Sequence, residues 1–202
     1  MSINPDAATL GDSAHAGAEV RSFQGVQWRC DTRVEKFHVD DFHSGREPYE
    51  TVDVPGNLLL LGGADVLWLG LRDGLSGTSG LANTKYNNGN AALGVGDSNT
   101  AAASSQTDLQ ASSGVTHRRF KGMDATFPTH TTGTAASTDS KILFKSTFTS
   151  SQSNFAWQEW GVSNKVSVAA KPGGRLLNRK VQSLGTKTSA GVWALTVTLS
   201  LA

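Results

Sequence analysis

Cysteine is almost missing from this chain, because Cys30 is the only one among its 202 residues. A single cysteine excludes a disulfide within the chain and a zinc site built from several cysteines. Cys30 lies in the run from Val26 to Val34, where apolar and polar residues alternate as in a half-buried strand. We therefore predict a small buried side chain and no reactive thiol.

Charged residues are also scarce, at 17% of the chain, and the formal net charge is +1. No basic block is longer than Arg118-Arg119 with Lys121. Proteins that bind nucleic acid without sequence preference usually carry a clustered basic face. We therefore expect no direct nucleic-acid partner.

No apolar run is long enough to cross a membrane. The longest, from Leu58 to Leu71, is interrupted by Asp65 and three glycines, whereas a spanning helix needs about 20 apolar residues. The first twenty residues lack the basic start and the apolar stretch of a signal peptide. These features predict a protein that is made in a cytoplasm and has no membrane partner.

Common motifs of catalysis and cofactor binding are missing as well. There is no Gly-Lys-Ser/Thr phosphate loop and no Gly-x-Ser-x-Gly nucleophile elbow. Residues 94–97 (Gly-Val-Gly-Asp) lack the third glycine and the helix of a dinucleotide loop, so we interpret them as a strand entering a turn. Residues 38–43 (HVDDFH) are more typical of a solvated turn than of a metal site, because so short a turn rarely supplies three convergent ligands. We predict no cofactor, no metal and no catalytic residue.

Glu159 stands between Trp157 and Trp160, and two roles can be weighed for it. Aromatic neighbours can keep a carboxyl protonated, so that it serves as a general acid in glycoside hydrolysis. That reaction needs a second carboxylate at a matched distance, and nothing in the sequence marks one. We favour a buried acceptor with an arginine partner. The candidates are Arg119, Arg175 and Arg179.

Alternation with a period of two predicts most of the secondary structure. It is strictest at residues 192–201, where Trp193, Leu195, Val197 and Leu199 alternate with small or polar residues. The other predicted strands are 26–39 (with a break near Glu35 as an alternative), 49–54, 91–96, 115–123, 141–148, 155–162 and 176–183. Residues 40–48 are expected to form a turn.

One helix is expected over residues 57–71, where Asn57 can cap the first turn. Apolar side chains, Leu58 and Trp68 among them, cover nearly every face of this helix, so a core or a partner must cover it. Residues 1–25 show little periodicity and few apolar residues, which predicts an arm. The fold class we predict is mostly β: an antiparallel β-sandwich over residues 26–202, with one buried helix and an extended N-terminal arm over residues 1–25.

Short motifs follow the apolar segment in a recognisable order. A Gly-x-Gly-Asp turn precedes a threonine-leucine element, an E-x-G-aliphatic strand and a G-x-L hairpin. The residues that carry this order are Gly94, Gly96, Asp97, Thr107, Leu109, Glu159, Gly161, Val162, Gly174 and Leu176. Over roughly residues 57–201 the chain resembles small structural proteins of tailed bacteriophages, and it is similar to the attachment domain of phage tail-collar fibres.

This resemblance implies a non-catalytic structural protein of a tailed-phage virion, made in the host cytoplasm. It would be an oligomeric tail collar or fibre-type attachment module whose partners are copies of itself and other virion proteins (tail or capsid subunits). A capsid decoration protein that cements the shell is an alternative, and a carbohydrate- or receptor-binding module is another. The structural or interface candidates are Trp157, Glu159, Trp160, Gly161, Trp193, Gly94, Gly96, Asp97, Leu58 and Trp68.

These hypotheses predict different surroundings for the same side chains. A structural module needs Trp157, Trp160 and Trp193 buried, whereas a sugar binder needs at least one of them flat and exposed. A glycan hydrolase needs a second carboxylate or a histidine within hydrogen-bond reach of Glu159, in a cleft.

Overall fold

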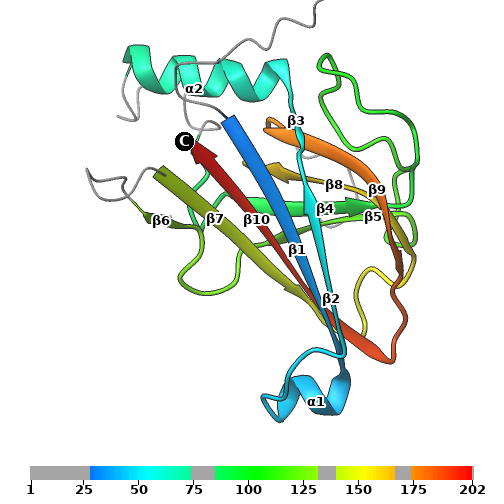
Figure 1. The fold of residues 1–202 in the computed structure, drawn as a ribbon. Coiled ribbons are helices and arrows are strands. Elements are labelled where there is room, and N and C mark those ends of the chain that lie inside the picture. The colour runs from blue at the N-terminus through cyan, green and yellow to red at the C-terminus, as the bar shows by residue number, and fades with distance from the viewer. Residues whose placement is uncertain (1–27, 74–84, 132–139, 167–173, 202) are drawn as a thin grey trace, which may run out of the picture.

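The computed structural model describes residues 28–73, 85–131, 140–166 and 174–201 (Figure 1). The arm predicted over residues 1–25 lies outside these ranges. The β-rich domain predicted to follow it makes up the described part of the chain.

Two antiparallel sheets of five strands pack together, so the predicted antiparallel sandwich is confirmed (Figure 1). The first sheet has the order β2 (Glu50–Pro55), β1 (Trp28–His38), β10 (Gly191–Leu201), β7 (Ser140–Phe148) and β6 (Thr129–Thr131). The second has the order β3 (Leu58–Leu59), β9 (Asn178–Thr186), β8 (Ala156–Ser163), β4 (Ala92–Gly96) and β5 (Arg118–Gly122). The strands β1 and β10, far apart in sequence, pair along their whole length in the first sheet, from Trp28 with Leu201 to His38 with Gly191.

Every strand predicted from alternation is present, with boundaries that differ by up to three residues, and residues 26 and 27 of the first predicted strand lie outside the described residues. The strand β1 is continuous, so the alternative break near Glu35 is wrong. The strands β3 and β6 were not predicted, because two or three residues carry no periodic signal. Part of the turn expected at 40–48 is a short helix, α1 (Val39–His43), which connects β1 to β2.

The main core lies between the sheets and is built around aromatic rings. Trp157 packs edge-on against Phe148 and Trp193, with ring centroids 4.8 and 4.9 Å apart. Trp160 Nε1 donates a hydrogen bond to Thr32 Oγ1 at 3.0 Å. These contacts connect β8 of the second sheet to β7, β10 and β1 of the first, and so they fix how the two sheets stack.

An irregularity in β8 points two tryptophans into this core. Residues three apart in a regular strand face opposite sides of a sheet. The pairing of β8 with β9 shifts register between Trp157 and Glu159, which allows both Trp157 and Trp160 to lie fully buried between the sheets. Glu159 therefore faces the outer side of the second sheet.

The helix α2 (Leu61–Asp73) begins four residues later than predicted. Leu58 and Leu59 form the short strand β3, which pairs with β9. The helix therefore does not begin directly after Asn57, and the predicted capping role of Asn57 is wrong. Within the described residues, no helix is long and apolar enough to span a membrane.

The helix α2 lies across one end of the sandwich (Figure 1). Gly63 sits directly on the second sheet, because a Cβ at this position would overlap the carbonyl oxygen of Leu177. Gly63 and Val66 are buried, whereas Leu61, Leu67 and Trp68 are exposed. Among the described residues, contacts to the rest of the fold lie on one side of the helix, and the other side carries the exposed residues Leu61, Leu67 and Trp68.

Candidate functional site

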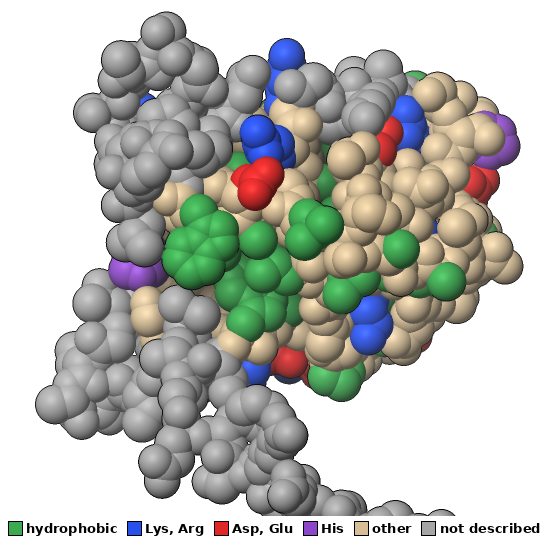
Figure 2. Space-filling view, turned by 90° about the horizontal axis from the view of Figure 1, so that it is seen from above, with side chains coloured by type: hydrophobic (Ala, Val, Ile, Leu, Met, Phe, Trp, Pro, Cys, Tyr) green, Lys and Arg blue, Asp and Glu red, His purple; other side chains and the backbone are tan. Residues whose placement is uncertain are grey.

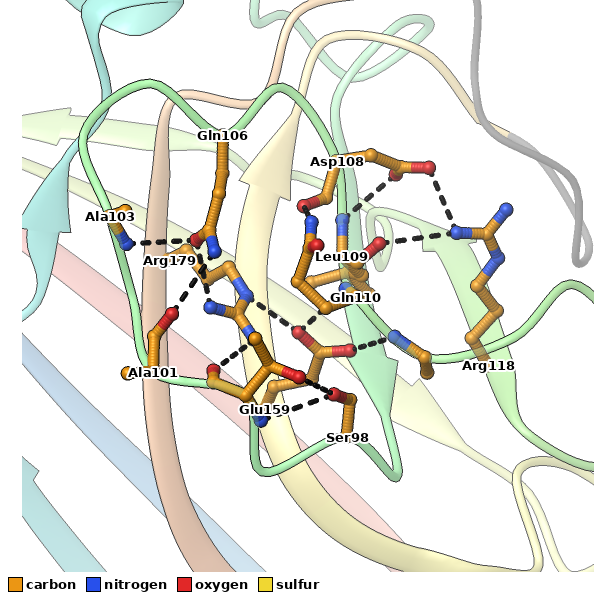
Figure 3. Close-up of polar contacts among 12 residues, drawn as sticks. Ser98, Ala101, Ala103, Gln106, Asp108, Leu109, Gln110, Arg118, Glu159 and Arg179 are labelled. Atoms are coloured by element: carbon orange, nitrogen blue, oxygen red, sulfur yellow. Dashed lines mark hydrogen bonds and ion pairs between the residues drawn. The ribbon is translucent and has the colours of Figure 1, made fainter.

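A buried ion pair joins β8 to β9 on the outer side of the second sheet (Figure 3). Arg179 Nε donates to Glu159 Oε2 at 2.6 Å, and both side chains are fully buried. The predicted pairing of Glu159 with an arginine is therefore confirmed, and the structure selects Arg179 among three candidates. Arg175 instead pairs with Asp65, at 3.0 Å, in an exposed position.

Glu159 holds one part of the loop formed by residues 97–117, which we call the anchored loop. The backbone N–H groups of Gln110 and Ala111 donate to Glu159 Oε2 and Oε1, at 3.0 and 2.6 Å (Figure 3). Both carboxylate oxygens thus accept hydrogen bonds from the loop that covers them. Charge-assisted hydrogen bonds of this kind are stronger than neutral ones.

Arg179 holds another part of the anchored loop. Its Nη2 donates to the carbonyl oxygen of Thr100 at 2.8 Å, and its Nη1 donates to Gln106 Oε1 at 2.9 Å. Gln106 also accepts from the Ala103 N–H at 2.9 Å and donates to the Ala101 carbonyl at 3.0 Å. One guanidinium group thereby organises residues 100–106, a task suited to its rigid planar fork of donors.

A second arginine fixes the remaining part of the anchored loop. Arg118, at the start of β5, donates from Nη1 to Asp108 Oδ2 at 2.8 Å and from Nη2 to Ser113 Oγ at 2.9 Å. At the ends of the loop, Asp97 Oδ2 lies 2.7 Å from His117 Nδ1. Asp97, which directly follows β4, therefore contacts the other end of the same loop.

Glycines on β4 leave room for this arrangement. A Cβ on Gly96 would lie 2.6 Å from Glu159 Oε1, and one on Gly94 would lie 2.5 Å from the ring of Phe120. On the neighbouring strand β8, a Cβ on Gly161 would overlap the Asn178 carbonyl oxygen. A second, smaller core lies beside these glycines and includes Leu109 of the loop. Its members are Leu60, Ala92, Leu109, Phe120 and Leu176.

The surroundings of Glu159 suit a structural role. Its three hydrogen-bond donors are one guanidinium and two backbone N–H groups, and no described carboxylate or histidine is among its partners. A glycoside hydrolase needs a second carboxylate beside an open cleft. In the described part of the chain, Glu159 has neither.

Three of the tryptophans singled out in the sequence are buried. Trp157 and Trp160 are 0% exposed and Trp193 is 3% exposed, as a structural module requires. None of the three offers a flat surface on which a sugar could stack. Trp68 differs, because it is 67% exposed on α2.

Exposed apolar side chains gather at the end of the sandwich that α2 covers, which Figure 2 views from above. We call this surface the apolar end, and it comprises Leu58, Leu61, Leu67 and Trp68. Leu61 is 61% exposed, and the N–H of this residue donates to the Ser104 carbonyl of the anchored loop at 2.9 Å. The anchored loop therefore positions the first turn of the helix, and with it the apolar end. Exposed apolar patches of this kind are typical of interaction surfaces.

Cys30 is 2% exposed in β1, so the predicted burial is confirmed. Desolvation by burial raises the pKa of its thiol to about 12, which keeps it protonated at neutral pH. In residues 38–43, Asp41 pairs with Arg46 and the His38 ring stacks on Tyr49. Within the described residues, no three His, Cys, Asp or Glu side chains come together as metal ligands.

Sequence reasoning missed the anchored loop as a unit. Gln106 and Asp108 belong to no predicted element, and Arg118 lies in a predicted strand that gives no sign of its partners, which are set by the tertiary fold. One weak signal exists, since Thr107 and Leu109 of the phage-like motif alternate with Gln106 and Asp108. Comparison of the chain with protein-family models, with curated proteins and with solved structures gave no match.

Proposed function

We propose that this protein is a non-catalytic structural component of a tailed-phage virion, specifically an oligomeric attachment module of the tail-collar or fibre type. One observation carries the proposal. Residues of the phage-like motif that are far apart in sequence meet around the anchored loop: Gly94, Gly96, Leu109, Glu159 and Leu176. Their shared task is to hold a loop on a sheet, which is an architectural role.

The chemistry of the anchored loop agrees with such a role. A buried ion pair adds little net stability compared with apolar packing, but removing one partner is costly, so the pair favours a single loop conformation. A subunit of a particle meets each neighbour through a repeated contact and therefore needs surfaces of defined shape.

The apolar end is the surface that we assign to a neighbouring subunit. Leu61 and Trp68 are both more than half exposed, and tryptophan is among the residues that contribute most at protein interfaces. The neighbour would be another copy of this chain or another virion protein.

Capsid decoration is the second candidate, because the same apolar end would serve a subunit that cements a shell. A carbohydrate- or receptor-binding module is favoured less, since three of the tryptophans are in the core and Trp68 is the widely exposed one among those described. These candidates place the protein at different positions on a particle.

Immunogold electron microscopy of the phage whose genome encodes this chain tests the proposal. Gold at the tail supports the attachment module, and gold distributed over the head supports capsid decoration. Purified particles that carry no label, and whose protein content lacks the chain by mass spectrometry, would contradict a virion role.

A further inference from the structure

A groove of about 400 Å³ lies on the outer face of the first sheet. It is formed by β2, β1, β10 and β7, which are neighbours in that sheet (Figure 1). Pockets that bind small molecules usually measure roughly 300 to 1,000 Å³, so this groove is large enough for a ligand. The residues along it include Asp31, Arg33, Asp53, Leu143, Thr196 and Thr198.

The register of the strands explains why the surface is hollow here. Thr196 and Thr198 alternate with buried core residues of β10, so their side chains point to the outer face of the sheet. Thr198 pairs with Asp31 of β1 and with Leu143 of β7, and these three side chains share that face. Thr196 pairs with Arg33 of β1 in the same way. Short side chains on β10 therefore form a floor between longer side chains on the neighbouring strands.

The fold leaves several hydrogen-bonding groups of the groove unused. Among the described residues, the Asp31 carboxylate forms no hydrogen bond or ion pair, and the hydroxyls of Thr196 and Thr198 form no hydrogen bond. Arg33 is held in place, because its Nε and Nη2 donate to the two carboxylate oxygens of Asp53 at 2.8 and 3.0 Å. This two-point contact fixes the plane of the guanidinium group, and its Nη1 keeps donors that no described residue uses.

The charges along the groove favour a neutral ligand. Two carboxylates, Asp31 and Asp53, lie beside one guanidinium group, that of Arg33, which gives a net formal charge of −1. A phosphorylated or otherwise anionic ligand would be repelled by the carboxylates, and a cation would meet Arg33. A neutral ligand rich in hydroxyl groups can donate to Asp31 and accept from Arg33, because a hydroxyl group is both a donor and an acceptor.

We propose that this groove binds a sugar residue. Asp31 accepts hydrogen bonds from hydroxyl groups of the sugar, Thr196 and Thr198 exchange hydrogen bonds with it, and Leu143 contacts its C–H groups. None of the described residues along the groove is aromatic, so the sugar gains no stacking contact and binds weakly. The site thus differs from the exposed tryptophan that a sugar platform requires. It lies on another surface than the apolar end, and the inference is independent of the virion role.

NMR spectroscopy of the full-length chain tests this inference, because it detects weak binding residue by residue. The methyl groups of threonine and leucine are isotope-labelled, and D-glucose, D-galactose, D-mannose, L-rhamnose and N-acetyl-D-glucosamine are titrated separately. We expect at least one of these sugars to shift the signals of Thr196, Thr198 and Leu143 until they saturate. Saturable shifts only at other positions, or none with any of the sugars, would overturn the inference.

Two substitutions on the same face of β1 supply matched variants. Asp31→Asn should weaken sugar binding about 10-fold, because hydrogen bonds to a charged acceptor are lost. Glu35→Gln removes the same charge outside the groove and should bind like the parent. Equal weakening in both variants would overturn the role of Asp31. Glycerol and inorganic phosphate are titrated in parallel. Equal saturation by glycerol would mean an adventitious additive only, and saturation by phosphate in place of the sugars would mean an anion site. Either result would overturn the inference, whether or not the particle carries the protein.

Discussion

At the scale of single residues, the charges buried on the second sheet determine the position of a loop. Glu159 and Arg179 are fully buried, yet their contacts go to the backbone or side chains of the anchored loop. A catalytic carboxylate must reach substrate, and this one is covered by residues 110 and 111. The contacts of the pair therefore hold the anchored loop in one position.

Replacing Glu159 with glutamine should lower the free energy of unfolding by about 3 kcal/mol, because the charge on Arg179 would stay buried without its counter-ion. Urea denaturation followed by tryptophan fluorescence measures this change. We expect no loss of any binding activity under conditions where the variant is folded. A variant that folds as stably as the parent but loses an enzymatic rate would contradict the structural role of Glu159.

Asp53→Asn provides the matched control for that experiment. Asp53 pairs with Arg33 at 2.8 Å, but both side chains are more than half exposed. Exposed ion pairs contribute little to stability and are screened by salt. The urea midpoint of Asp53→Asn should therefore stay close to that of the parent. An equally large loss in both variants would mean that burial is not the cause.

Lys187 is a buried cation whose nearby polar partners are neutral. It is 1% exposed, and its Nζ donates to Thr149 O at 2.7 Å and to Asn154 Oδ1 at 2.9 Å. Burial lowers the pKa of Lys187 to about 8, whereas a lysine in an unfolded chain titrates near 10.4. Between these values the unfolded chain binds more protons than the folded one. The contribution of Lys187 to stability therefore rises as the pH increases from about 8 to about 10.

The difference in unfolding free energy between the parent and Lys187→Met should reveal this effect. We expect the difference to shift in favour of the parent by up to about 1.4 kcal/mol per pH unit across that window. Urea titrations of both proteins at pH 7, 8, 9 and 10 measure this difference. Subtracting the variant's unfolding free energy from that of the parent at each pH removes the contributions of all other titrating groups, which the two proteins share. A difference that stays constant from pH 7 to 10 would show that Lys187 titrates normally.

At the scale of elements, two adjacent glycines in α2 have opposite surroundings. A Cβ on Gly62 would meet nothing within 4 Å, whereas one on Gly63 would overlap the backbone of Leu177. The sequence presents both as helix-weakening residues. The close approach of α2 to the second sheet explains only Gly63.

Alanine substitutions should separate the two glycines. Gly62→Ala should stabilise the protein by up to about 1 kcal/mol, because alanine favours the helix and no atom obstructs it. Gly63→Ala should destabilise it, since the helix would have to move away from Leu177. Thermal unfolding of the two variants side by side measures both effects. A stabilising Gly63→Ala would contradict the packing of α2 described here.

At the scale of the whole molecule, the apolar end predicts association. We expect the full-length chain to form an oligomer, and Trp68→Ser to weaken its assembly by about 30-fold, since an interface tryptophan is worth about 2 kcal/mol. Light scattering over a dilution series measures the change in mass. Val115→Ser changes an exposed apolar residue outside the apolar end, 51% exposed against 67% for Trp68, and should assemble like the parent. A parent chain that is monomeric at every concentration would contradict self-association through this surface.

Much of the architecture could be predicted, because the alternation of apolar and polar residues along a strand shows which of its faces is buried. In β10, the alternation of Trp193, Leu195 and Val197 with smaller residues identifies a strand without knowledge of any partner. Burial of Cys30 followed from the same reasoning. The start of α2 could not be predicted, because Leu58 and Leu59 are equally compatible with a helix, and only pairing with β9 assigns them to a strand.

The sequence by itself determined that the protein is mostly β and where nearly all the longer strands lie, and it favoured an arginine partner for Glu159. These properties depend on neighbours along the chain or on the cost of burying a charge alone. Only the tertiary structure decided that β1 lies beside β10, that Arg179 is the partner of Glu159, and that one side of α2 remains exposed. Contacts between distant segments decide such features, because many pairings satisfy the same local pattern and only the packing of the complete fold selects one of them.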